Sequence, residues 1–84
     1  MKVYIVVTYA DGENYNDYMP TIDGVFVNKE DAMNQYVESC KQFAPEEGEE
    51  YEDIEGNGYY EITNFYSDYH ATVRIIEEEV VGIN

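Results

Sequence analysis

The first residues of the chain alternate between two sets of side chains, in the two-residue repeat of a β-strand. The segment KVYIVVTY at 2–9 has one face made of Val3, Ile5, Val7 and Tyr9 and another made of Tyr4, Val6 and Thr8. Its β-branched and aromatic residues favour a central place in a sheet. The polar segment ADGENYNDYMP is typical of a loop. The run TIDGVFV at 21–27 predicts a second strand, with Gly24 marking a bulge.

A helical repeat replaces this alternation after Asn28. Asn28 is a good N-cap, and Glu30 and Asp31 favour the positive end of a helix that begins there. The apolar residues that follow recur at helical spacing and predict one stripe buried against the sheet, formed by Ala32, Met33, Tyr36, Val37, Cys40 and Phe43. Pro45 is expected to end the helix. The residues expected to face away from the sheet are Glu38, Ser39, Lys41 and Gln42.

Two further runs near the end of the chain have strand character. GYYEITNFY at 58–66 and HATVRIIEEEVV at 70–81 predict a hairpin. The order β-β-α-β-β predicts an α+β fold, in which one helix packs on one face of a four-stranded, mostly antiparallel sheet. The helix would make a right-handed parallel crossover if the second and third strands were neighbours. Residues 1–84 are expected to form a single domain, since 84 residues bury only a modest core.

One helix covers only one face of such a sheet. The other face is expected to expose some of Tyr4, Val6, Tyr59, Phe65, Tyr66 and Ile76. An open apolar and tyrosine-rich face is typical of an interface. The alternative is that a loop or a second copy of the chain covers it.

The charge balance adds an argument about partners. The chain has 19 Asp and Glu against 4 Lys and Arg, a net charge of −15, and its basic residues are dispersed at Lys2, Lys29, Lys41 and Arg74. Such a field repels nucleic acid and anionic membranes and speeds encounter with basic surfaces. Neither direct nucleic-acid binding nor membrane binding is expected, because no basic patch is present to neutralise phosphates. The alternative is an acidic protein without a special partner.

The strongest concentration of charge lies in PEEGEEYEDIEG, at residues 45–56. Seven of the ten residues from 46 to 55 carry a carboxylate, and none is basic. Their mean spacing is about 5 Å in an extended chain and about 2 Å along a helix axis. These values bracket the rise of about 3.4 Å per phosphate along one DNA strand. Gly48 disfavours a helix, so an irregular loop or a single turn is expected.

This acidic run supplies most of the candidate partner-binding residues. They are Glu46, Glu47, Glu49, Glu50, Glu52, Asp53 and Glu55, with Tyr51 as an aromatic anchor. Aromatic residues interleaved with the charges favour an interface over a solvated tail. The alternative is a solvated loop in which Tyr51 packs back onto the sheet.

Two smaller clusters extend the negative charge. Glu77, Glu78 and Glu79 end the last predicted strand and join the candidate partner-binding set. Alternation sends the first and third of these to one face and Glu78 to the other. The first loop carries the third cluster, Asp11, Glu13 and Asp17. The three clusters together are expected to form a broad negative surface.

Residue types needed for catalysis or metal binding are scarce. His70 is the only histidine and Cys40 the only cysteine, so a His-based metal cluster and an internal disulfide are excluded. Cys40 is better explained as a buried hydrophobe than as a nucleophile. The segment at 11–17 lacks the ligand order of a calcium loop. No enzymatic activity and no cofactor are therefore expected. The first apolar run is too short for a signal peptide or membrane span, which favours the cytoplasm.

The overall profile resembles that of the DNA-mimic inhibitors that phages carry against host defence, notably anti-CRISPR and anti-restriction proteins. The likeness rests on the small size, the net charge of −15, the run EEGEEYEDIE and the single cysteine. It implies competition for the basic DNA-binding groove of a nucleic-acid-binding protein such as a CRISPR effector nuclease, in the host cytoplasm if the chain is phage-encoded. Separately, KVYIVV followed by DGVFVNKEDAMNQYV looks like a small strand–strand–helix domain of phage and bacterial genomes, which implies a fold for the first half.

Two other classes of function fit the same features. An antitoxin or immunity protein that neutralises a basic ribonuclease would share the acidity and the small size. Gene neighbourhood separates it from a phage inhibitor. A homodimeric structural or regulatory domain would use the tyrosine-rich sheet face, and light scattering would reveal it.

Overall fold

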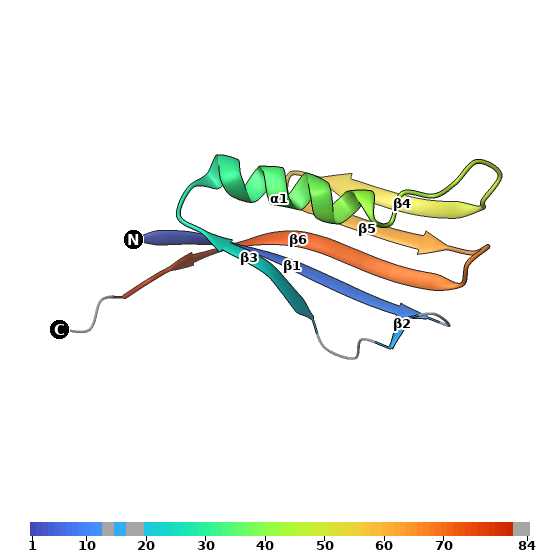
Figure 1. Cartoon of the computed structure of the whole chain (residues 1–84), viewed down its shortest axis with the longest axis horizontal. Coiled ribbons are helices and arrows are strands. Elements are labelled where there is room, and N and C mark those ends of the chain that lie inside the picture. The colour runs from blue at the N-terminus through green and yellow to red at the C-terminus, as the bar shows by residue number, and fades with distance from the viewer. Residues whose placement is uncertain (13–14, 17–19, 82–84) are drawn as a thin grey trace.

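A computed structural model describes residues 1–12, 15–16 and 20–81 of the chain (Figure 1). Within these residues there are one helix and six strands, of which β2 is only two residues long. In chain order the elements are β1 (Lys2–Gly12), β2 (Tyr15–Asn16), β3 (Thr21–Phe26), α1 (Lys29–Lys41), β4 (Tyr51–Gly56), β5 (Tyr59–Asn64) and β6 (Tyr69–Glu79).

All the strand pairs are antiparallel, and the order across the sheet is β2-β1-β6-β5-β4, with β3 also paired to β1. The predicted α+β class with one helix on one face is confirmed. The prediction of four strands is wrong for two reasons. Residues 51–56, expected as an irregular loop or turn, form the edge strand β4, and the two-residue β2 lies in the segment expected as the first loop. The second and third predicted strands are not neighbours. They are β3 and β5, and α1 leads from β3 to β4 at the opposite edge (Figure 1).

The core lies between α1 and one face of the sheet. Its buried members are Val6, Ala10, Ala32, Tyr36, Phe43, Tyr60, Ile62, Ala71 and Val73. Tyr4 packs against this cluster. Tyr4 and Val6 therefore belong to the covered face, and their expected place on the open face is wrong. The cause is register: the even-numbered residues of β1 face α1.

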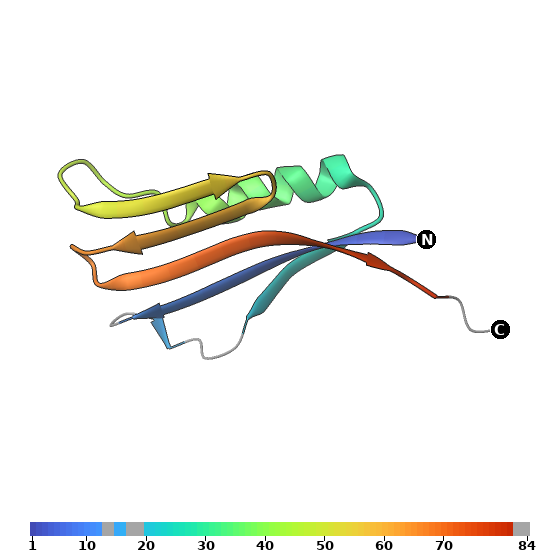
Figure 2. The same cartoon turned by 180° about the vertical axis from the view of Figure 1, so that it is seen from behind.

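The open face of the sheet is the one turned toward the viewer in Figure 2, with α1 behind it. Tyr59 and Ile76 lie on this face as expected, opposite Arg74 and Ile5 on the neighbouring strands. Phe65 and Tyr66 do not, since β5 ends before them and both are exposed in the turn that leads to β6.

The helix begins as the sequence predicts. The Asn28 side chain accepts a hydrogen bond of 2.8 Å from the Glu30 N–H, which caps the first turn. The helix ends at Lys41, before Pro45, with Gln42 as its C-cap. The predicted helix face is wrong at two positions. Val37 is 47% exposed, whereas Ser39 is only 4% exposed.

A bulge in β3 explains why a polar residue replaces an apolar one under the helix. Val6 pairs with Gly24 and Val7 with Ile22, so Asp23 is the extra residue, next to the predicted glycine. The Asp23 carboxylate accepts hydrogen bonds from the hydroxyls of Thr8 and Ser39, the latter at 2.5 Å. One carboxylate thus joins β1, β3 and α1.

The helix offers a matched pair of variants that tests this packing. Ala32→Asp places an unpaired charge at a position with no exposure and should cost about 3–5 kcal/mol of folding free energy, a large part of the total for a small domain. Val37→Asp places the same charge at a half-exposed position and should leave the protein folded. Thermal denaturation followed by circular dichroism measures both. Equal melting temperatures for the two variants would contradict the position of the helix.

Candidate functional site: the acidic loop and edge strand

The acidic run divides into two parts with different structures. Residues 46–50 form the loop that follows α1, and Tyr51–Gly56 form β4 at the edge of the sheet. Figure 1 shows this loop at one end of the molecule, beyond the ends of the neighbouring strands. The run is therefore an ordered structure attached to the sheet along its second half.

Glu49 fastens the loop to the turn between β5 and β6. One of its carboxylate oxygens accepts the Glu46 N–H at 2.6 Å, and the other accepts the Ser67 hydroxyl at 2.8 Å and the Asn64 amide at 3.3 Å. These hydrogen bonds hold the pKa of Glu49 below its usual value, and the bond from the Glu46 N–H has the largest effect. Glu49 thus stabilises the fold, unlike the neighbouring carboxylates of the acidic run.

Asn64 completes this attachment from the other side. It is 1% exposed, and its side-chain oxygen accepts the backbone N–H groups of Tyr66 and Ser67 at 3.0 and 2.8 Å. An Asn that accepts from the following backbone is a stable turn former. Asp68 in the same turn has a φ of 53°, in the left-handed region.

The strand β4 turns its side chains alternately to the two faces of the sheet. Asp53 and Glu55 lie opposite Ile62 and Tyr60, on the face that carries α1. Glu52 and Ile54 lie opposite Thr63 and Glu61, on the open face. Carboxylates therefore border both faces of this edge, and every residue of β4 is exposed.

Two tyrosines near these carboxylates differ in their exposure. Tyr51 is 45% exposed, so it does not pack fully back onto the sheet. The Tyr60 hydroxyl reaches the Asp53 carboxylate at 3.5 Å. Burial, and secondly the charge of Asp53, raise the pKa of Tyr60 to about 12. Tyr51 alone of the two remains accessible to a partner.

The cluster Glu77–Glu79 lies at the other end of the molecule, which is 53 Å long. Its residues pair with the first residues of β1. The start of β4 lies at the opposite end of the sheet, where β5 ends and β6 begins. The Glu79 carboxylate accepts a hydrogen bond of 2.9 Å from the N-terminal ammonium group, and the Glu77 carboxylate lies 3.9 Å from the Lys2 Nζ. This cluster does not adjoin the acidic loop and is partly neutralised.

Only one residue of the third cluster can be placed. Asp11 lies opposite His70, at the same end of the sheet as the acidic loop. Glu13 and Asp17 lie outside the described residues. The negative surface is thus concentrated at one edge and one end, with a separate group of glutamates at the far end.

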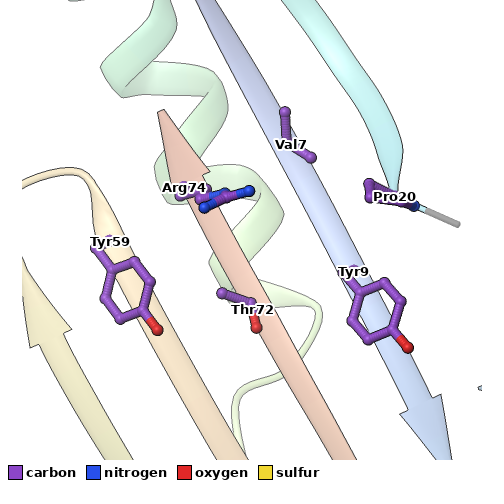
Figure 3. A pocket seen from close by; sticks show the side chains of 6 residues that line it. All are labelled: Val7, Tyr9, Pro20, Tyr59, Thr72 and Arg74. Atoms are coloured by element: carbon purple, nitrogen blue, oxygen red, sulfur yellow. The ribbon is translucent and has the colours of Figure 1, made fainter. Parts of the chain in front are cut away.

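The open sheet face holds a hollow of about 330 Å³ that the sequence did not reveal. Figure 3 shows the Arg74 side chain between Tyr59 and Val7, with Tyr9, Thr72 and Pro20 completing the rim. Beside it the Tyr59 hydroxyl donates to Glu61 at 2.5 Å, and His70 lies 3.5 Å from the same carboxylate. The alternation that puts Tyr59 and Arg74 on one face was the available signal.

Cys40 and His70 do not form a catalytic pair. Cys40 lies in α1, on the core side of the sheet, and His70 lies on the open face beside Glu61. Burial raises the pKa of the Cys40 thiol, which disfavours the nucleophilic thiolate. Within the described residues, no three side chains of His, Cys, Asp or Glu come together as metal ligands. The one helix in the described part of the chain is too short and too polar to cross a bilayer.

The attachment through Glu49 predicts a pH effect. A lowered folded-state pKa means that the charged carboxylate stabilises the loop above the ordinary glutamate value of about 4.3, and that this contribution is lost as the pH falls through the folded-state pKa. Glu49→Gln should lower the protection of the Glu46 amide against hydrogen exchange at pH 7. In this variant the protection should no longer depend on pH in the acid range, whereas in the parent protein it should fall. The control is Glu47→Gln, which removes the same charge from the same loop. Equal protection in both variants would show that Glu49 does not hold the loop.

Comparison with protein-family models, with curated proteins and with solved structures finds no match to this chain.

Proposed function

We propose that this chain is an acidic protein inhibitor that presents carboxylates in place of nucleic-acid phosphates. Its target is the basic DNA-binding groove of a defence nuclease such as a CRISPR effector. The observation that carries the proposal is the exposed row of carboxylates along the acidic loop and β4. Among its members, the side chains of Glu47, Glu50 and Glu52 make no hydrogen bond or ion pair within the described residues.

The geometry of β4 supports this proposal through its spacing. The rise per residue of a strand is about 3.3 Å, and the rise per phosphate along one strand of duplex DNA is about 3.4 Å. Asp53 and Glu55 lie on the same face of β4, two residues apart, so their spacing of about 6.6 Å is close to the spacing of about 6.8 Å between every second phosphate. A groove lined by Arg and Lys at phosphate spacing therefore meets negative charge at a similar repeat. A carboxylate also accepts the paired N–H groups of an Arg.

The positions of the cations leave this surface unneutralised. Lys41 pairs with Glu38 at 3.0 Å on the helix, and Lys2 lies beside Glu77 at the far end. Arg74 lies on the open sheet face. Between Lys41 and His70 the sequence contains no basic residue. A basic partner therefore supplies the counter-charge that the chain lacks.

The mechanism is competition, without a chemical step. The inhibitor occupies the groove, and the nuclease then fails to bind its DNA. An antitoxin or immunity protein would use the same surface against a basic ribonuclease, and the identity of the inhibited enzyme distinguishes these two roles.

The open sheet face favours a second candidate function, a homodimeric structural or regulatory domain. Ile22 and Val25 remain 62% and 57% exposed there, next to Val7 and Ile5 of β1. Apolar side chains left in water on one face are typical of an interface.

The homodimer has its own test. Sedimentation at physiological salt should show a dimer that Ile22→Lys and Val25→Lys dissociate. A monomer at all concentrations would contradict this second candidate.

The inhibitor function is tested by cleavage assays on purified RNA-guided nucleases and restriction endonucleases. At equimolar amounts the chain should suppress cleavage of target DNA by a susceptible enzyme. Excess duplex DNA or added salt should relieve the suppression, because both compete with charge–charge contacts. Two results together would contradict the proposal. One is undiminished cleavage by every enzyme of the panel, and the other is that the immobilised chain binds no protein from a host lysate that DNA can displace.

The location of the site is tested by two triple variants of equal charge. Glu50→Gln, Glu52→Gln and Glu55→Gln together should weaken inhibition at least tenfold, with about 2–5 kcal/mol for each contact to a buried Arg. Glu77→Gln, Glu78→Gln and Glu79→Gln together remove the same charge from the far end and should change inhibition less than threefold. Glu49 is left intact because it holds the loop. Equal effects of the two triples would show that net charge, and not the β4 edge, inhibits.

A further inference from the structure

The strand β4 has one side without a partner in the described part of the sheet. It pairs with β5 alone. The Phe65 N–H donates to the Glu50 carbonyl at 2.9 Å, which shows that the peptide groups of Glu50 point toward β5. Since peptide groups alternate along an antiparallel strand, Glu52 and Ile54 also bond to β5. The peptide groups of Tyr51, Asp53 and Glu55 then point to the open edge.

A hollow of about 400 Å³ lies beside this edge, on the face that carries the helix. Its walls come from the second half of α1, from the residues that follow it, and from the end of β4. Apolar and aromatic groups contribute most of them, namely Tyr36, Val37, Cys40, Ala44, Pro45 and Tyr60, and the charged Lys41 and Glu55 complete the lining with Gly56. The exposure of Val37, which the helical pattern did not predict, is explained by its place in this wall. The hollow has room for a medium-sized apolar side chain.

A second hollow borders β4 on the open face and differs in its chemistry. Glu52 and Glu61 line it together with Asp53, Thr63, Tyr51 and Ile54. The two faces of the edge therefore present different surroundings. An added strand would meet mostly apolar walls with Glu55 at their border on one face, and Glu52 and Glu61 on the other.

Charge decides which strand fits. A second copy of β4 would place Glu52, Asp53 and Glu55 against the same residues, and like charges across a strand pair are destabilising. Charged side chains on an edge strand are a common means of preventing such self-association. A strand that carries Lys or Arg turns this repulsion into attraction.

We propose that β4 accepts an extended basic segment of another protein as an additional strand of the sheet. The segment alternates apolar and basic residues. Its apolar side chains enter the hollow between α1 and β4, and its Arg or Lys side chains lie beside Glu52 and Glu61. Main-chain hydrogen bonds to Tyr51, Asp53 and Glu55 supply binding energy and orientation, as in other cases of strand addition. The inference rests on the proposed function in taking the partner to be basic, and adds how that partner is held.

The probe is a nine-residue peptide in which Arg and Val alternate, with both ends blocked. Two further forms of it are N-methylated at every second residue, so that each lacks the donors of one strand edge. All three peptides carry the same charge. Binding is measured by titration calorimetry at low salt, and the amides of Tyr51, Asp53 and Glu55 are followed by hydrogen exchange.

Strand addition predicts that one methylated form binds within threefold of the parent peptide, whereas the other binds at least tenfold more weakly. The three edge amides should become protected when the parent peptide is bound. Binding of both methylated forms as tightly as the parent, or edge amides that stay unprotected, would overturn strand addition. Such a result would leave the inhibitor function standing as a purely electrostatic contact. A parent peptide that does not bind would also overturn strand addition, and the nuclease assays would judge the inhibitor function separately.

Variants of the chain test the same contact from the other side. Asp53→Pro and Asp53→Asn remove the same charge, but only Pro removes the N–H that points to the edge. The Pro variant should bind the peptide at least fivefold more weakly than the Asn variant. Val37→Glu should also weaken binding through the apolar hollow, while Val27→Glu, at an exposed position outside it, should not. Equal binding by the Pro and Asn variants, both folded by circular dichroism, would overturn the proposal. Should the Pro variant not fold, the methylated peptides decide the question.

Discussion

The pairing of β1 with β6 is the constraint on which the rest of this small fold depends. Eleven consecutive residue pairs, from Lys2 with Glu79 to Gly12 with Tyr69, join the two ends of the chain at the centre of the sheet. The short β2 and β3 attach to one side of this pair, and the hairpin of β5 with β4 attaches to the other. Because the register is fixed over so long a pair, the side that faces α1 is fixed for every other strand. The same register carries Glu77–Glu79 to the end of the sheet that lies away from the acidic loop.

The sequence was sufficient for the elements whose residues follow a simple repeat. The alternation in β1, the Asn28 cap and the final hairpin identified most of the sheet and the helix. The pattern failed at β4 because exposed edge strands need no apolar face, so charge concealed the extended structure of residues 51–56. It failed at Ser39 for a different reason. The partner of Ser39 is Asp23, brought under the helix by a bulge whose geometry no local pattern encodes.

The candidate site was predictable in composition and not in arrangement. The run of carboxylates is visible in the sequence, but the separate role of Glu49 depends on Asn64 and Ser67, which lie in another hairpin. The hollow beside Val37 likewise depends on how α1 leans over the strands. Two carboxylates, Asp23 and Glu49, hold elements together, whereas those of Glu52 and Glu55 on β4 face water. The same residue type therefore stabilises the fold at some positions and remains available for binding at others.

The carboxylates along β4 also make the colloidal behaviour of the chain depend on acidity. At neutral pH, mutual repulsion keeps two such edges apart even though their peptide groups are free to pair. The isoelectric point is about 4.1. Near that pH the repulsion fades, while Tyr51 and Ile54 remain exposed on the same strand, one on each face. The protection of this edge against pairing with a second copy therefore depends on the ionisation of its own side chains and weakens as the pH approaches the isoelectric point.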